Sequence, residues 1–226
     1  MIKNKKLIFA LVIFSILFYA SWAVVELILK NAFASFFKDE VVMALIRDTL
    51  IKNLLWTLPA LLLIKHFEKD MYVGLKEMRS FKRSDITTLL LLLVFLTVYV
   101  LLGVFIRKRS LPINENFGAD DIIVVLFVGI TEELVFRGWL LNSMLKNPDT
   151  DMKKYIALGI NAVMFLIIHF PIWISNGSFV TNFTSVSFLS ILLLSAVFGM
   201  SFIRTKNIFV PIILHSFYDL LVFMFV

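Results

Sequence analysis

Long apolar stretches alternate with short polar ones along the whole chain. An apolar run of about 20 residues can cross the roughly 30 Å hydrocarbon layer of a membrane as one helix. We therefore predict an all-α, polytopic membrane bundle of about seven transmembrane helices, within a range of six to eight. The expected spans are Leu7–Leu29, Val41–Ile64, Ile86–Ile106, Asp121–Leu145, Tyr155–Trp173, Val186–Ile203 and Ile208–Val226.

No linker, repeat or shift in composition divides the 226 residues, so we expect one integral membrane domain over 1–226. The first apolar stretch follows several lysines, as the apolar core of a signal peptide does. Its run is too long for such a core, and we expect it to be retained as a helix. Within the domain, residues 121–226 should form a four-helix region that holds most of the polar residues of interest.

Composition supports the membrane interpretation. Hydrophobic residues make up 60% and charged residues 17% of the chain, and its mean hydropathy is +0.93. A soluble domain has about 45–50% apolar and about 25% charged residues, and a disordered chain has still fewer apolar ones. Cysteine is absent from the sequence, which excludes disulfides, thiolate zinc sites and a catalytic thiol.

The net charge of +6 is compatible with a nucleic-acid partner or with a membrane surface. With a cytoplasmic N-terminus, the seven spans place most of the 22 lysines and arginines on the cytoplasmic side. This is the positive-inside pattern of a multi-pass cell-membrane protein, with Arg107–Arg109 as the exception. The charge therefore indicates orientation in a lipid bilayer and no nucleic-acid partner.

Ionisable residues inside apolar spans are costly and often mark function. Glu132, Glu133 and Arg137 lie near the middle of the fourth span. Glu133 and Arg137 are four residues apart, which places them one above the other on a helix. Glu132 points about 100° away, so it needs a partner on another helix or a proton.

Two histidines lie in later spans. His169 follows Phe165 by one turn in the fifth span, and His215 precedes Asp219 by one turn in the seventh. An interhelical hydrogen bond would explain either histidine alone. Because both occur together with a pair of glutamates and an aspartate at similar depth, we predict one shared polar site.

Charged residues nearer the N-terminus have simpler explanations. Glu26 lies near the outer end of the first span and can reach the interface. Arg47, Asp48 and Lys52 fall in the second span, where an interfacial helix or an Asp48–Lys52 pair would account for them. None of these residues alone supports a function.

Three kinds of chemistry suit the predicted site. A carboxylate in apolar surroundings can act as a general base on water. Alternatively, Glu132, His169 and His215 match a ligand set for Zn²⁺ or another divalent metal with one position open for water. Chains of glutamate, histidine and aspartate also relay protons in carriers, so residue spacing leaves a protease and a proton-coupled transporter both open.

Three motifs favour the protease. Glu132 to Arg137 reads EExxxR, Phe165 to His169 reads FxxxH, and His215 to Asp219 reads HxxxD. In this order, on hydrophobic helices, they resemble the motifs of the CPBP family of intramembrane CAAX proteases and bacteriocin-processing proteins, also called the Abi family. The resemblance covers the last four helices, whereas the first 120 residues agree only in being membrane-spanning.

The resemblance implies an intramembrane endopeptidase that cleaves a peptide or membrane-associated protein with glutamate-activated water. It makes Glu132 the general base and His169 its partner, while His215 and the residue at 219 stabilise the oxyanion. Glu133, Arg137 and Phe165 would support the site. The family resemblance does not settle whether a metal takes part, and the sequence does not indicate the oligomeric state.

Residue 219 departs from the CAAX-processing branch, which usually has asparagine there. An ionised aspartate cannot donate a hydrogen bond to an oxyanion. Asp219 would then orient His215 or Arg137, or bind a metal, and prenylated substrates become less expected. The sequence looks more like the bacterial branch, which is linked to bacteriocin self-immunity, peptide maturation or signalling in the plasma membrane. A non-enzymatic scaffold or immunity factor with the same fold is the alternative.

Overall fold

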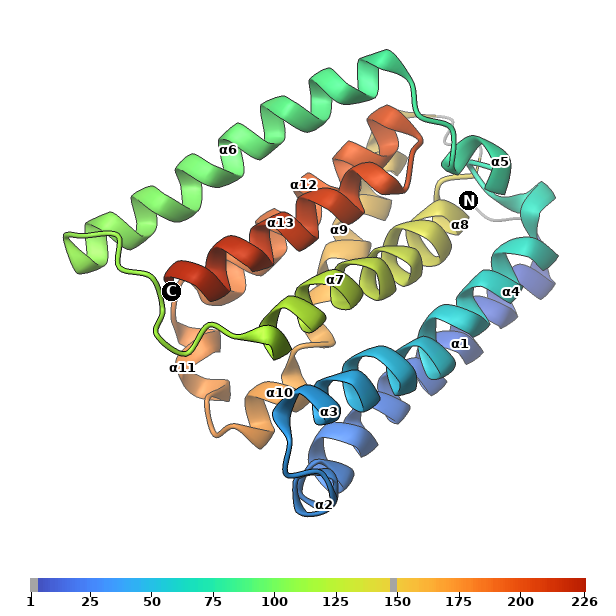
Figure 1. The fold of residues 1–226 in the computed structure, drawn as a ribbon. Helices are drawn as coiled ribbons and strands as arrows, with labels where there is room; N and C mark the ends of the chain where they lie inside the picture. Colours follow the sequence, from blue (N-terminus) through green and yellow to red (C-terminus); the bar gives the residue numbers. More distant parts are fainter. Residues whose placement is uncertain (1–3, 147–149) are drawn as a thin grey trace.

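The computed structural model describes residues 4–146 and 150–226, and every regular element in these two ranges is a helix (Figure 1). Seven helical segments cover the seven predicted spans. They are α1–η1–α2 (Lys5–Val24, Val25–Leu29, Lys30–Phe36), α3–η2–η3–α4 (Glu40–Ala44, Leu45–Ile51, Asn53–Thr57, Leu58–His66), α6 (Arg83–Lys108), α7–η5–α8 (Ala119–Glu133, Leu134–Leu141, Asn142–Met144), α9–α10 (Asp151–Ile167, Phe170–Ser175), α12 (Ser187–Thr205) and α13 (Phe209–Phe225).

The connections between these segments hold only short helices. They are η4 (Glu68–Asp70), α5 (Leu75–Met78) and α11 (Phe179–Thr184). Segments η1, η2, η3 and η5 are wide π-helical turns inside longer helices. Such turns are rare, and they occur often at functional sites.

Length and composition allow four helical segments of the described chain to cross a membrane. They are Lys5–Phe36, Arg83–Lys108, Asp151–Ser175 and Ser187–Thr205. Helix α13 is apolar but shorter. The helical bundle confirms the predicted fold class, although charged residues keep the second and fourth segments from being recognised as spans by apolarity alone.

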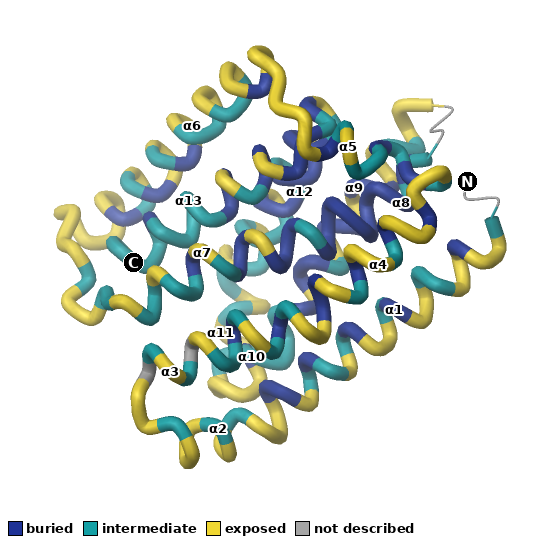
Figure 2. Tube along the Cα trace, turned by 45° about the vertical axis from the view of Figure 1, so that its right-hand side comes forward, coloured by how far each residue is buried: buried dark blue, intermediate teal, exposed yellow. Residues whose placement is uncertain are grey.

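The segments lie side by side as a bundle (Figure 1). Helix α13 packs against α7 and α6, and α9 packs against α12. Buried residues concentrate along α7, α8, α9 and α12, whereas α1 and α6 turn exposed faces outward (Figure 2). Large apolar side chains such as Leu17 and Leu91 are exposed on those faces, as expected for surfaces that contact lipid.

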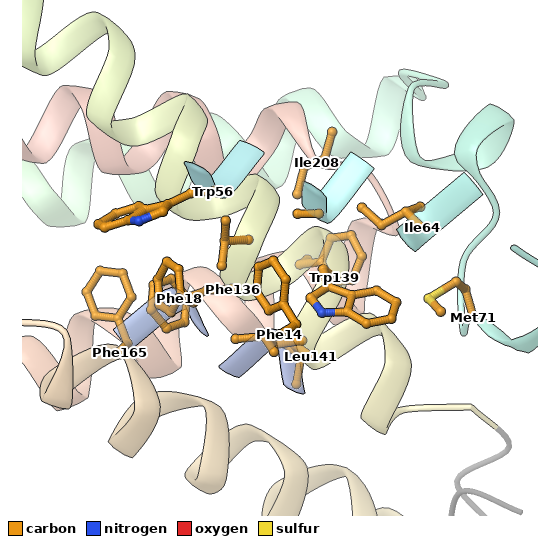
Figure 3. Packing of buried hydrophobic residues seen from close by; sticks show 14 of the residues in the cluster. Phe14, Phe18, Trp56, Ile64, Met71, Phe136, Trp139, Leu141, Phe165 and Ile208 are labelled. Carbon is orange, nitrogen blue, oxygen red and sulfur yellow. The ribbon is translucent and has the colours of Figure 1, made fainter. Parts of the chain in front are cut away.

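A row of aromatic rings forms part of the core (Figure 3). Phe18 contacts Trp56 and Phe136, with ring centroids 4.6 and 5.6 Å apart, and Phe136 contacts Phe165 at 4.9 Å. The row joins the first, second, fourth and fifth helical segments. The row ends at Phe165, one turn before His169, and so packs against the predicted polar site.

Candidate active site

The two glutamates end helix α7, where the backbone changes from an α-helix to the wide turns of η5. Three residues earlier, Gly129 faces α13. A Cβ atom at Gly129 would lie 3.1 Å from the backbone nitrogen of Ser216 and 3.3 Å from the carbonyl of Ile212. The missing side chain therefore lets α7 and α13 approach closely enough for the glutamates to meet His215.

Glu133 is the centre of a fully buried ionic network. Its Oε1 accepts a 2.8 Å hydrogen bond from Arg137 Nη1, which confirms the pair predicted from their four-residue spacing. Nη2 of Arg137 donates to the carbonyl and to Oγ of Ser195, both at 2.8 Å. Phe165 and Phe198 flank the guanidinium at 4.7 and 5.7 Å. These contacts compensate the cost of burying the charges.

His215 joins this network from α13. Its Nδ1 lies 2.8 Å from Oε1 of Glu133, which fixes the orientation of the ring. The imidazole stacks on Phe198 at 5.1 Å and meets Phe165 edge-on at 5.6 Å. Held in this way, the opposite nitrogen, Nε2, points towards the two remaining carboxylates.

Those carboxylates belong to Glu132 and Asp219. Oε2 of Glu132 is 4.0 Å from His215 Nε2, and Oδ2 of Asp219 is 3.5 Å from the same atom. Within residues 4–146 and 150–226, the Glu132 carboxylate has no hydrogen-bond partner, although the residue is only 8% exposed. Glu132 therefore keeps its oxygens available for a water or a substrate, in contrast to its neighbour Glu133.

His169 lies where two helices of the fifth segment meet, inside the predicted span, and Asp151–Ser175 is long and apolar enough to cross a membrane. Helix α9 ends at Ile167 and α10 begins at Phe170. Pro171 explains the break, because proline has no backbone N–H and disfavours helical geometry in the residue before it. His169 Nδ1 lies 2.8 Å from the carbonyl of Phe165, which leaves Nε2 free.

The predicted site residues therefore converge. The ring of Phe165 contacts both histidines, at 5.3 Å from His169 and 5.6 Å from His215. His169 also interacts electrostatically with Glu132 and His215. Asp219 contacts His215, and no contact joins it to Arg137 among the described side chains. Of the two partners predicted for Asp219, the geometry favours His215.

The second helical segment adds buried charges to the same centre. The Asp48–Lys52 ion pair predicted from the sequence is present at 3.1 Å, and both residues are buried. Lys52 interacts electrostatically with His169 and Asp219. The sequence alone assigned Lys52 no function. The available signal was a lysine within an apolar run. Because Asp48 lies one turn away, a local ion pair already explained the lysine.

Glu26 also departs from its interpretation as an interfacial residue. It is 2% exposed, and neither of its side-chain oxygens has a hydrogen-bond partner in the described part of the protein. Its nearest cation is Lys30, at 3.7 Å. Helix α10 packs against the η1 segment that contains Glu26, a contact that the sequence alone does not show.

A divalent metal ion at this site is an expectation from the sequence. Among the described residues, no three histidine, aspartate or glutamate side chains are arranged to hold one. Both Nδ1 of His215 and Oε1 of Glu133 are taken up by their mutual contact. A requirement for Zn²⁺ or another divalent metal stays a hypothesis, and no step below passes through it.

Residues 116–221 match the family model described as "Type II CAAX prenyl endopeptidase Rce1-like". The match contains all three motifs and confirms, for this region, the resemblance that they indicated. Comparisons with curated proteins and with solved structures found no significant match.

Proposed function

Starting from the Rce1-like CAAX endopeptidase match over residues 116–221, we propose that this protein is an intramembrane endopeptidase that cleaves with glutamate-activated water. One observation supports the proposal most. Glu132 and Glu133 are neighbours in sequence, yet Glu133 is held by Arg137 and His215 while the carboxylate of Glu132 stays unbonded. This is the division expected between a structural carboxylate and a general base.

In the proposed reaction, Glu132 takes a proton from a water molecule whose oxygen attacks the peptide carbonyl. His169 holds that water through Nε2, since Nδ1 is bound to the carbonyl of Phe165. Nδ1 of His215 donates to Glu133, so the scheme requires the doubly protonated imidazolium, whose Nε2–H donates a hydrogen bond to the oxyanion. The proton on Glu132 then passes to the leaving amine as the C–N bond breaks.

Asp219 has a supporting part in this scheme. Its carboxylate, 3.5 Å from Nε2 of His215, favours the protonated imidazole that the scheme requires. An oxyanion role for Asp219 itself would need a proton on its carboxyl group. We assign it instead to the orientation and charge of His215.

The substrate class we propose is a peptide or membrane-associated protein that reaches the site within the bilayer. Bacteriocin self-immunity, peptide maturation and signalling are the candidate settings, in a bacterial plasma membrane with the N-terminus cytoplasmic. The distribution of lysine and arginine supports this orientation. Aspartate at position 219 favours substrates without a prenyl group, so both kinds belong in an assay.

The test measures cleavage of quenched fluorescent reporter peptides, with and without a prenyl group, by the purified protein in detergent or vesicles. Glu132→Gln keeps the shape of the side chain but removes the base, and we expect activity to fall about 10²–10⁴-fold. Glu115→Gln, at an exposed carboxylate in the connection before α7, is the matched control and should cleave like wild type.

Full cleavage by Glu132→Gln would contradict the assignment of the base. Absence of cleavage by the wild type, together with a cellular phenotype that survives substitution of Glu132, His169 and His215, would favour the non-enzymatic scaffold. Proton movement coupled to transport of a solute in vesicles would favour the carrier.

A further inference from the structure

Lys52 is a buried cation of the second helical segment. It lies between the wide turns η2 and η3, and it is 6% exposed. Its Nζ is 3.1 Å from Oδ1 of Asp48 and lies over the rings of Trp22 and Trp56, at 4.5 and 5.4 Å. An ammonium group held over two aromatic faces is stabilised away from water.

Asp48 does not neutralise Lys52 completely. Its other oxygen, Oδ2, accepts hydrogen bonds from Arg47 Nη2 at 2.8 Å and Nε at 3.1 Å. Two cations thus share one carboxylate, which leaves one surplus positive charge. A buried surplus charge is costly unless another group compensates it.

Arg47 also interacts electrostatically with Glu26, whereas Lys52 interacts with groups of the active site. The residue after Lys52 is Asn53, whose Oδ1 accepts a 3.5 Å hydrogen bond from Thr131, the residue before Glu132. Lys52 also interacts electrostatically with His169 and Asp219. The carboxylates of Glu132, Glu133 and Asp219 face Arg137 and the protonated His215, which leaves one negative charge in surplus. The positive charge of Lys52 therefore acts on two residues of the reaction centre.

Apart from His215, the described part of the site has no other cation open to a substrate. Arg137 has no exposed surface, and its two terminal nitrogens are bonded to Glu133 and Ser195. Asp219 in its ionised form can only accept hydrogen bonds. An oxyanion would thus have His215 as one donor and would need a second, because such intermediates are stabilised by donors fixed in advance.

We propose that Lys52 is this second donor and stabilises the oxyanion of the tetrahedral intermediate; the inference rests on the proposed function. When the water oxygen bonds to the carbonyl carbon, the π electrons of the carbonyl move to its oxygen, and Nζ–H of Lys52 donates a hydrogen bond to that oxygen. When the carbonyl re-forms, the C–N bond breaks and the amine takes the proton from Glu132. Lys52 keeps its own protons throughout, so it acts by charge and not by proton transfer.

The test compares Lys52→Met and Lys52→Arg with Lys30→Met, measuring kcat and KM on a reporter peptide that the wild type cleaves. Lys30 is the matched control, since it pairs with the buried Glu26 of the first segment and contacts Asn176, away from the reacting groups. We expect Lys52→Met to lower kcat about 10²–10³-fold with little change in KM. Lys52→Arg should recover part of that loss, and Lys30→Met should stay close to wild type.

Binding provides a second measurement. A peptide phosphinate with anionic oxygens in place of the scissile carbonyl mimics the intermediate, whereas the parent peptide does not. Lys52→Met should weaken binding of the phosphinate strongly. It should weaken binding of the parent peptide much less, which is measured in proteins that also carry Glu132→Gln so that the peptide is not cleaved.

Three results would overturn the inference. The first is equal kinetics for Lys52→Met and Lys30→Met. The second is a rise in the KM of Lys52→Met alone, which disappears with peptides amidated at their C-terminus. The third is an equal loss of affinity of Lys52→Met for the phosphinate and the parent peptide. The last two would assign Lys52 to a substrate carboxylate or to the fold. If Glu132→Gln abolishes cleavage while Lys52→Met does not, only this inference fails and the proposed function stands.

Discussion

At the scale of single residues, Arg137 makes one contact that its place in the sequence predicts and one that it does not. Its guanidinium is completely buried and bonds to Glu133, four residues earlier on the same helical segment, and to Ser195 on α12. The first contact follows from helix periodicity and was predicted. The second depends on which residue of another helix faces Arg137, and no local pattern encodes that.

Replacing Arg137 tests this arrangement. Arg137→Met should leave Glu133 as a buried charge paired only with His215, and the expected cost is about 3–5 kcal/mol of unfolding free energy. Thermal unfolding in detergent would measure it. Because the cost comes from the uncompensated charge, the double variant Glu133→Gln with Arg137→Met should be more stable than Arg137→Met alone. Equal stability of the two would show that the guanidinium acts by packing rather than by charge.

At the scale of elements, helix ends and close approaches decide where the site residues lie. Pro171 ends α9 and places His169 at a junction, where its Nδ1 binds the carbonyl of Phe165. The proline was visible in the sequence, yet the apolar run around it still predicted one span. Hydropathy reports burial in lipid and is insensitive to a helix break inside the run.

Gly129 governs the contact between α7 and α13. In Gly129→Ala the new Cβ would displace Oγ of Ser216 and press on the backbone of α13 at 3.1 and 3.3 Å, and we expect the resulting shift to loosen the contact of the glutamates with His215. We expect lower thermal stability and a loss of cleavage of at least about tenfold. Gly159→Ala in α9 is the control, because its Cβ meets nothing within 4 Å and alanine favours a helix. A Gly129→Ala protein that behaves like Gly159→Ala would contradict this role.

On the scale of the whole molecule, Asp70 joins three distant segments outside the spans. Its carboxylate accepts a hydrogen bond from Asn4, the N-cap of α1, at 2.8 Å, and another from Lys146, beyond α8. The Lys146 hydrogen bond, followed by the Asn4 hydrogen bond, lowers the pKa of Asp70 from its usual 3.8. The contact ties the start of the first segment to the connections after the second and fourth.

This contact predicts a pH dependence. Since the folded-state pKa is lowered, the stabilisation is present above the ordinary pKa of 3.8 and is lost as the pH falls through the lower folded value. Asp70→Asn should therefore be slightly less stable than wild type at pH 7, by at most about 1 kcal/mol because the pair is partly exposed. The difference in melting temperature should vanish in acid. A difference that persists unchanged at pH 2 would exclude the carboxylate as its source.

Much of this protein was predictable from its sequence. The number and order of helical segments and the Glu133–Arg137 pair follow from hydropathy and spacing, because these are local properties of the chain. The set of seven motif residues came from the resemblance to a known family. Tertiary structure decided the rest. The packing of the helices gives Glu133 hydrogen-bond partners and leaves Glu132 without one. It also places Asp219 beside His215 and brings Lys52 near the same centre from a segment about 80 residues earlier. Such contacts depend on the rotation and close approach of helices, which distant packing residues set and apolar periodicity does not specify.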